Sequence, residues 1–163
     1  MRKTLTTQDY TYLEQWLHLA QEALDAGDRP FGSILVSQDG KVLATARNRV
    51  NEINIVAHPE YELAVWAINN LSLEERMNAT LYTSGEHCPM CAGAHAWAEI
   101  GKVAYISSGS QLALWLKELN LPDLPIRFLP IEDIVKNIIV KGPAEGKLLE
   151  RIRQMHIEYF KKE

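Results

Sequence analysis

Apolar residues recur at helical spacing in several parts of the chain. Near the N-terminus they mark one face of a predicted helix that Thr6 or Thr7 can cap and that Gly27 ends; this face holds Leu13, Trp16, Leu17, Ala20 and Leu24. A final helix has an apolar face made of Leu148, Ile152, Met155 and Tyr159. Three further helices are predicted over residues 60–70, 90–100 and 112–119.

Short apolar runs between these helices predict strands. Residues 31–37 and 41–46 flank Asp39-Gly40, a dipeptide typical of tight hairpin turns. Further strands are predicted over residues 79–84 and 103–107, and a short one over 126–129 in a proline-rich segment. Because strands alternate with helices after the hairpin, we expect an α/β fold with a mixed sheet covered by helices on both faces.

Length and composition are typical of one globular domain spanning residues 1–163. Apolar residues make up 47% of the chain and charged residues 23%. The formal net charge is −4, so no overall positive field attracts nucleic acid, and we do not expect a nucleic-acid partner. The N-terminus lacks the apolar core of a signal peptide, and no apolar run is long enough to span a bilayer. We therefore expect a cytoplasmic protein that does not bind membranes.

Two short stretches carry residues that bind metals. His58-Pro59-Glu60 offers an imidazole, and Glu86-His87-Cys88-Pro89-Met90-Cys91 offers two thiols, from the 2 cysteines of the chain. Zinc binds imidazole and thiolate well, and three protein ligands leave the fourth tetrahedral position free for water, as in catalytic zinc sites. We therefore expect one zinc ion per chain, bound by His58, Cys88 and Cys91.

A proline in each stretch indicates where a helix begins. Pro59 follows His58 and Pro89 follows Cys88, and proline is favoured at the first helical position. Two helices are therefore predicted to start side by side, with N-termini directed at one metal and dipoles that favour thiolate over thiol. With His58 at the N-cap, Glu60 is expected beside the metal-bound water, where it acts as the catalytic acid and base.

This pattern resembles the zinc-dependent cytidine/deoxycytidylate deaminase superfamily, whose signature is H-x-E followed by P-C-x-x-C, and within it the guanine deaminase-like branch. His58 and Glu60 match the first half of the signature, and Cys88 and Cys91 match the second. His87 stands where the family usually has proline. The resemblance covers roughly residues 10–110. It implies a three-layer α/β/α sandwich with a mixed five-stranded sheet, and a homodimer whose subunits pack near the site.

The resemblance also implies contacts with the substrate. Phe31, in Pro30-Phe31-Gly32, would lie against the substrate ring, and Asn48 would bind the ring through its amide. The alternatives are a core aromatic for Phe31 and a turn residue for Asn48. His87 changes the loop on the amine-binding side and is expected to contact the substrate. Pro59 lacks the N–H with which family members often bind a carbonyl of the base.

Other aromatic residues favour packing over binding. Trp66, Trp97 and Trp115 lie on predicted helices and are expected in the core. Tyr159 and Phe160 lie near the end of the last helix. We expect them to pack there, although some family members cover the active site with C-terminal aromatic residues.

The reaction predicted from these residues is hydrolytic deamination of a ring carbon that bears an exocyclic amine. Glu60 would take a proton from the zinc-activated water and pass protons to the ring nitrogen and the leaving ammonia. The expected substrate is a small amino-heterocycle, such as guanine, cytosine or a nucleoside.

Three alternatives stay open. A tRNA adenosine deaminase shares the core motifs, although the acidic balance argues against a large RNA surface. A non-catalytic zinc-stabilised binding module would want a fourth ligand, for which His87 and His95 are the nearby candidates, and would have no use for Glu60. A thiol–disulfide oxidoreductase would need Cys88 and Cys91 free of metal.

Overall fold

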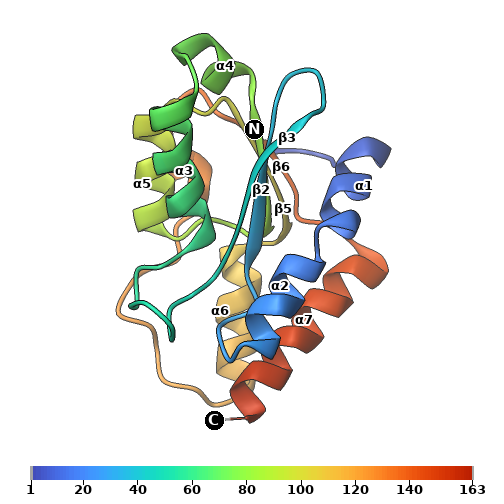
Figure 1. Ribbon diagram of the computed structural model, residues 1–163. Coiled ribbons are helices and arrows are strands. Elements are labelled where there is room, and N and C mark those ends of the chain that lie inside the picture. The colour runs from blue at the N-terminus through green and yellow to red at the C-terminus, as the bar shows by residue number, and fades with distance from the viewer. Residues whose placement is uncertain (1, 163) are drawn as a thin grey trace.

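A six-stranded sheet forms the middle of the computed structural model, which describes residues 2–162 (Figure 1). The strands lie in the order β1-β6-β5-β4-β2-β3. Their bounds are β1 Arg2–Lys3, β2 Gly32–Val36, β3 Val42–Arg47, β4 Thr80–Gly85, β5 Lys102–Ser107 and β6 Ile139–Lys141. β2 is antiparallel to both of its neighbours, whereas β4, β5, β6 and β1 run parallel. The predicted mixed sheet is confirmed, with six strands in place of five.

One edge of the sheet differs from the sequence prediction. The predicted strand over residues 126–129 is not formed, and residues 121–130 contain no regular helix or strand. Prolines at 122, 125 and 130 explain this, because a residue without an N–H cannot complete a strand ladder. β6 pairs with β5 instead of the predicted strand, and the two-residue β1 pairs with β6 at the edge of the sheet.

Helices cover both faces of the sheet. Within residues 2–162 these are α1 Thr7–Gln15, α2 His18–Asp25, α3 Pro59–Asn70, α4 Leu73–Asn78, α5 Pro89–Ala98, α6 Gly109–Glu118 and α7 Gly146–Lys161, with a 3₁₀ turn, η1, at Ile131–Asp133. α3 and α5 lie on one face, and α1, α2 and α7 lie on the other (Figure 1). The adjacent β2 residues Ile34 and Leu35 belong to different cores, one on each face. The three-layer α/β/α sandwich is confirmed. None of the helices described is both long and apolar enough to cross a membrane.

The N-terminal helical segment is divided in two. Thr6 caps α1 in a capping box with Asp9, as the sequence allows. The helix stops at Trp16, where hydrogen bonds from Leu17 N to Glu14 O and from Leu19 N to Trp16 O make a tight turn before α2. The predicted apolar face survives this break, since both halves contribute to one core.

Small residues bring neighbouring elements close to the sheet. Ala92 and Ala98 of α5 are buried, as its small-residue composition predicts. Gly32 begins β2 against α2, and a Cβ at this position would lie 2.5 Å from Leu19 Cβ. Glycine at this point therefore lets the Pro30-Phe31-Gly32 segment pass beneath α2.

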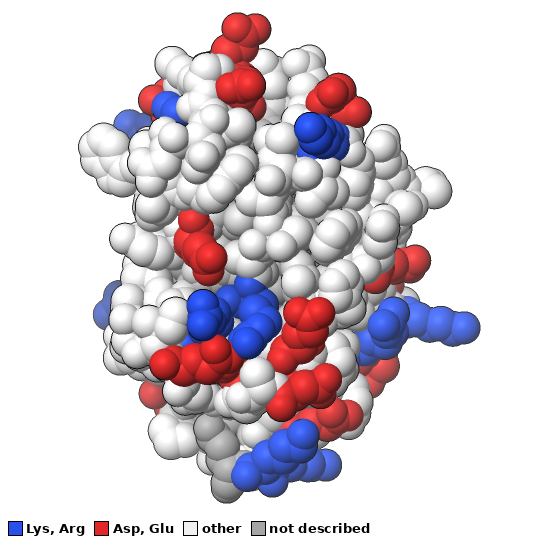
Figure 2. All heavy atoms as spheres, in the orientation of Figure 1, with Lys and Arg blue, Asp and Glu red and all other residues white. Residues whose placement is uncertain are grey.

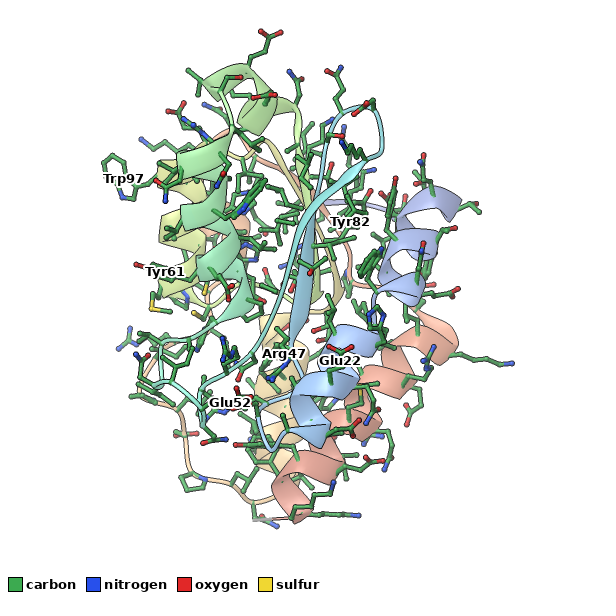
Figure 3. All side chains as sticks on the ribbon, in the orientation of Figure 1. Glu22, Arg47, Glu52, Tyr61, Tyr82 and Trp97 are labelled. Carbon is green, nitrogen blue, oxygen red and sulfur yellow. The ribbon has the colours of Figure 1, made fainter. Side chains whose placement is uncertain are left out.

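The three predicted core tryptophans have different environments. Trp115 of α6 is buried, and Trp66 of α3 is partly buried against the core beneath that helix. Trp97 is 86% exposed, and its side chain points away from α5 (Figure 3). The prediction for Trp97 is wrong because α5 buries Ala92, His95 and Ala98 and leaves the indole on its outer side.

Candidate active site

The first turns of α3 and α5 create the centre of the site. His58 is the N-cap of α3 and Cys88 is the N-cap of α5, both with extended backbone, and a proline follows each at the first helical position. The two helices lie side by side (Figure 1). Their N-termini therefore converge as predicted, and Cys91 joins them from the first turn of α5.

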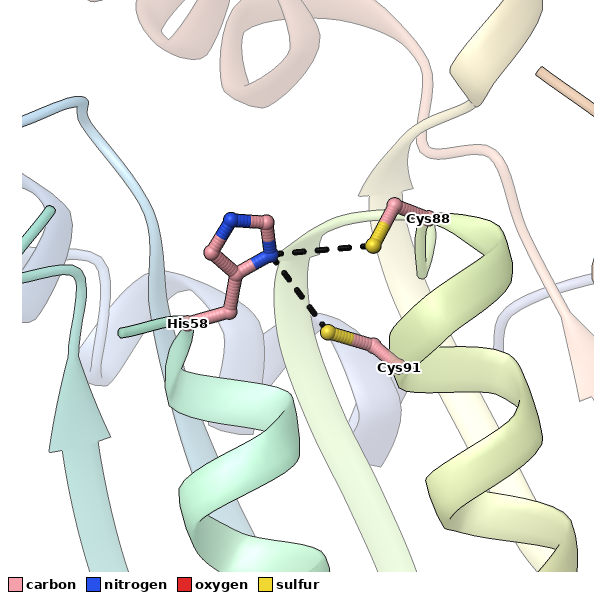
Figure 4. Close-up of side chains that lie close together, drawn as sticks. All are labelled: His58, Cys88 and Cys91. Atoms are coloured by element: carbon pink, nitrogen blue, oxygen red, sulfur yellow. Dashed lines mark hydrogen bonds between the residues drawn. The ribbon is translucent and has the colours of Figure 1, made fainter. Parts of the chain in front are cut away.

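The three side chains form a compact group of metal-binding atoms. His58 Nδ1 lies 3.6 Å from Cys88 Sγ and 3.5 Å from Cys91 Sγ (Figure 4). All three atoms lie within 4.8 Å of one another. Tetrahedral zinc, with Zn–S bonds of about 2.3 Å and Zn–N bonds of about 2.0–2.1 Å, separates nitrogen from sulfur by about 3.5 Å. The donor set thus fits zinc in type and spacing, and it could hold this metal.

Hydrogen bonds orient the imidazole. His58 Nε2 lies 3.1 Å from the carbonyl oxygen of Ile55, to which it donates, and Nδ1 is then the acceptor that faces the sulfurs. A backbone carbonyl commonly fixes a metal-binding histidine in this way. Burial disfavours protonation of His58, but the Cys88 sulfur and the Glu60 charge outweigh it and raise its pKa.

The two thiols share one proton unequally. A hydrogen bond from Cys91 lowers the pKa of the Cys88 thiol to about 4, against the opposing effect of burial, and His58 lowers it further. The hydrogen bond with Cys88, together with burial, raises the pKa of Cys91. The site therefore presents a thiolate at Cys88, which favours binding of a cation.

Glu60 lies beside this group and has its own hydrogen-bond network. Its side chain is buried, with 5% of the residue exposed. Oε1 accepts from Thr83 Oγ1 at 2.8 Å and lies 3.4 Å from Ser33 Oγ. Ser33 and Thr83 are register partners on β2 and β4, and Ser33 Oγ also donates to Thr83 Oγ1 at 2.9 Å.

Burial controls the chemistry of Glu60. Burial raises its pKa above the usual value, and this effect exceeds the opposing effects of the His58 charge and the Thr83 hydrogen bond. A carboxyl group with a raised pKa can accept and return a proton at neutral pH more readily than an exposed one. The structure thus places a buried carboxyl group with a raised pKa on the same cavity wall as His58 and Cys88.

A cavity of about 70 Å³ opens in front of these residues. Its polar wall includes His58, Glu60, Cys88 and Glu86. Glu86 has no free oxygen there, because its carboxylate accepts from the Gly109 and Ile131 backbone N–H groups. Apolar side chains from α6, the segment that follows it and the end of α7 complete the wall, among them Leu112, Leu116, Leu124, Phe128 and Phe160.

Two of the three predicted substrate contacts line this cavity. Phe31 lies on its wall, and so does Asn48, at the end of the β3 segment. The Asn48 side-chain oxygen accepts from the Val50 N–H at 3.1 Å, and its backbone N–H donates to the Phe31 carbonyl at 2.9 Å. These bonds fix Asn48 next to Phe31.

His87, the third predicted contact, lies elsewhere. It is buried and is not among the cavity-lining residues. Its Nε2 donates to His95 Nδ1 at 3.0 Å, because His95 Nε2 donates to the Ile100 carbonyl at 2.9 Å. The expected substrate contact by His87 finds no support in this arrangement. His95 is a packed helix residue, as predicted, and neither histidine belongs to the group of metal-binding atoms.

The C-terminal helix contributes more to the site than the sequence suggests. Tyr159 packs in the core and its hydroxyl accepts from Asn51 Nδ2 at 3.1 Å, as expected for terminal packing. Phe160 instead lines the cavity, with His156 one turn before it. Arg29, just before β2, also lines the cavity. The four-residue spacing of His156 and Phe160 places them on one helix face, but nothing in the sequence shows that this face meets the site.

Comparison with known proteins identifies the family. The MafB19-like deaminase model matches residues 7–142. A probable cytosine deaminase of Schizosaccharomyces pombe is 34% identical over 123 residues, which are 75% of each protein. A guanine deaminase of Bacillus subtilis is 36% identical over 105 residues (63% of this chain, 67% of the relative), and a tRNA-specific adenosine deaminase of the same species is 36% identical over 100 residues (61% and 62%).

Solved structures agree with this assignment. A guanine deaminase from Nitrosomonas europaea has the same fold with a TM-score of 0.68 and 17% identity, over 98% of this chain and 87% of that one. The B. subtilis guanine deaminase gives a TM-score of 0.55 and 29% identity, over 77% and 83% of the two chains. The chain therefore belongs to the MafB19-like deaminases of the cytidine/deoxycytidylate deaminase superfamily, and it is a hydrolytic deaminase.

Proposed function

We propose that the protein hydrolyses the exocyclic amine of a small amino-heterocycle, using one zinc ion held by His58, Cys88 and Cys91, with Glu60 as the proton carrier. The supporting observation is the group of three metal-binding atoms at a cavity whose wall includes His58, Cys88 and the buried Glu60. Zinc, when bound, lowers the pKa of water enough for attack near neutral pH.

The side chains of this protein account for the proton transfers. A C–O bond forms at the ring carbon, the C–N bond to the amine breaks, and water and substrate become a cyclic amide and ammonia. Glu60 Oε2 is not engaged by the hydroxyls of Ser33 and Thr83, which both lie nearest to Oε1. Glu60 takes one proton of the attacking water and passes it to the ring nitrogen. It then takes the second proton from the hydroxyl now on the ring carbon and passes it to the leaving amine.

The cavity favours a small planar heterocycle as the substrate. Its walls are largely apolar, with Phe31 as an aromatic surface and Asn48 as a hydrogen-bonding group beside it. A planar base suits such a site, in which a few polar groups set the orientation. Guanine, cytosine or a nucleoside fits this description, and the cytosine and guanine deaminases among the relatives support it.

A tRNA adenosine deaminase is the second candidate, because the similarity to the B. subtilis tRNA-specific enzyme favours it. The charge distribution argues against it. The net charge is −4, and on the face shown in Figure 2 basic side chains lie next to acidic ones and form no continuous basic surface. Polynucleotide binding relies on several contacts between cations and phosphates.

An ammonia-release screen tests the proposal. The rings are aminopurines, aminopyrimidines, their nucleosides, pterins and triazines, with tRNA assayed in parallel for adenosine-to-inosine conversion. We expect release from at least one free base or nucleoside and none from the Glu60→Gln protein. Turnover of tRNA alone, with binding that weakens steeply as salt rises, would contradict the proposal.

A further inference from the structure

Two polar side chains of the cavity wall have no part in the proton transfers proposed above. Arg29 precedes β2 and His156 lies on α7, and both line the cavity. The imidazole of His156 is 2% exposed and packs edge-on against Phe31, with 5.0 Å between ring centroids. Trp115 lies 5.9 Å away from the same imidazole. These aromatic contacts fix His156 beside the predicted ring-stacking residue.

Both side chains have buried nitrogen atoms that lack a protein partner. Within residues 2–162, no hydrogen bond engages Arg29 Nε or His156 Nε2. No carboxylate in the part of the chain that the structure describes forms an ion pair with Arg29. By contrast, Arg47 pairs with Asp28 and with Glu52, and Figure 3 shows Arg47 and Glu52 close together. A buried donor without an acceptor costs about 1–3 kcal/mol, and more when it is charged. A bound ligand that offers an acceptor would remove this cost.

The charges of the two groups indicate which kind of ligand atom they bind. Burial, together with the positive charge of Arg29, lowers the pKa of His156 to about 3, so its imidazole is neutral at pH 7. Arg29 is then the cation of the pair, with N–H groups as its only hydrogen-bonding atoms. A guanidinium beside a neutral imidazole suits an oxygen that carries partial negative charge, such as a carbonyl conjugated with ring nitrogens.

We infer that Arg29 and His156 bind an exocyclic oxygen of the substrate ring, and that the enzyme therefore selects amino-oxo heterocycles over amino rings without that oxygen. The inference rests on the deaminase function proposed above and narrows its substrate class. Phe31 lies between this pair and the proposed catalytic residues, since it lines the same cavity and contacts His156. Guanine, cytosine and isocytosine belong to the selected class.

Three pairs of rings that differ in this oxygen test the inference. They are guanine and 2-aminopurine, cytosine and 4-aminopyrimidine, and isocytosine and 2-aminopyrimidine. For the best pair, we expect the parent enzyme to prefer the oxo ring by about tenfold or more in kcat/KM, since a site built to bind a polar group rejects the analogue lacking it. Arg29→Gln should lower kcat/KM for the oxo ring by about tenfold or more, and by less than about threefold for its partner.

Matched variants separate recognition from folding. Arg151→Gln removes an exposed arginine of α7 and should leave both rates unchanged. His156→Phe keeps an aromatic ring against Phe31 and should also reduce the preference for the oxo ring. Equal losses on both rings of a pair, or an unchanged preference in Arg29→Gln, would overturn the inference. Thermal melting of each variant identifies any that fails to fold.

Titration calorimetry measures the binding of the oxo rings directly and does not require turnover. The Glu60→Gln protein and its double variant with Arg29→Gln are titrated with guanine, cytosine and isocytosine. Binding that weakens about tenfold when Arg29 is lost supports the inference, whether or not the parent releases ammonia. A parent that binds these rings but releases no ammonia would refute only the proposed deamination. Binding that does not depend on Arg29, or no binding of any oxo ring, would refute the inference.

Discussion

The proposed reaction depends on the carboxylate of Glu60, which carries the protons. It is buried beside the metal-binding atoms, and its hydrogen bonds come from side chains of two strands beneath it. Replacing Glu60 by glutamine keeps the size of the side chain and removes its capacity to carry protons. We expect Glu60→Gln to retain the fold and the zinc, and to lower kcat by about 10²–10⁴-fold. Activity within a few-fold of the parent would remove Glu60 from the mechanism.

Thr83 positions that carboxylate. Its hydroxyl donates to Glu60 Oε1 at 2.8 Å. Thr83→Val keeps the shape of the side chain but removes the donor, and we expect kcat to fall roughly ten- to hundredfold, because a hydrogen bond to a charged group contributes about 1.5–3 kcal/mol. KM should change by less than about threefold. Steady-state kinetics of Thr83→Ser provides the control, since it restores the hydroxyl and should recover most of kcat.

At the scale of elements, the candidate metal ligands lie at the N-termini of two helices, α3 and α5. We expect about one zinc per chain in the parent by elemental analysis, and almost none in Cys88→Ala or Cys91→Ala, because each variant leaves two ligands. Chelation should lower the melting temperature reversibly, since a metal that binds only the native state stabilises it. The protein should stay folded without metal, because α3 and α5 keep their apolar core. Full zinc content in Cys88→Ala would contradict the assigned ligands.

Asp9 links α1 to strands β4 and β6 of the sheet through hydrogen bonds and an ion pair. Its carboxylate accepts from Lys141 Nζ at 2.9 Å and from the Tyr82 hydroxyl at 2.8 Å. Burial alone would raise the pKa of Asp9, but the hydrogen bonds from Lys141, Thr6 and Tyr82 outweigh it and lower the pKa below its usual value. Its contribution to stability is therefore present above about pH 4, the usual value for aspartate, and is lost as the pH falls through the lower pKa of the folded state.

Urea unfolding of Asp9→Asn across this range measures the contribution. We expect the variant to be less stable than the parent at pH 7, and the difference to shrink as the pH falls below about 4. Asp25→Asn, which removes an exposed carboxylate of α2, should leave stability nearly unchanged. A difference between Asp9→Asn and the parent that is constant from pH 7 to pH 2 would show that the charge of Asp9 is not what stabilises the contact.

Local signals predicted the metal site, and the parts that were missed depend on long-range packing. His58, Cys88 and Cys91 each lie at or next to a helix start that a proline marks, so short stretches of sequence define their geometry. Phe160 and His156 reach the cavity because α7 packs against β5 and α2, and Arg29 reaches it from the segment before β2. His87 lies away from the cavity for a local reason, because its buried imidazole pairs with His95, two turns along α5.

At the scale of the whole molecule, the outer side of α3 and α5 is unusually apolar. Tyr61, Val65 and Ile68 of α3 are exposed at helical spacing, and Trp97 projects from the neighbouring α5. Figure 3 shows Tyr61 and Trp97 on the same outer side of these helices. Exposed apolar patches of this kind mark interaction surfaces. We therefore propose that this surface pairs two copies of the chain in a homodimer.

Light scattering at micromolar concentration tests this proposal. The parent should give about twice the monomer mass of 18.5 kDa. Val65→Glu places a charge in the centre of the exposed row and should produce monomers, because an unpaired charge is costly to bury in an interface. Leu114→Glu changes an exposed leucine of α6 instead and should remain dimeric. A parent protein of monomer mass would refute the dimer, and a Val65→Glu protein that stays dimeric would move the interface away from α3. Since His58 is the N-cap of α3 and Glu60 lies in its first turn, a dimer formed through this helix would also hold the proposed metal ligand and the proposed proton carrier in place.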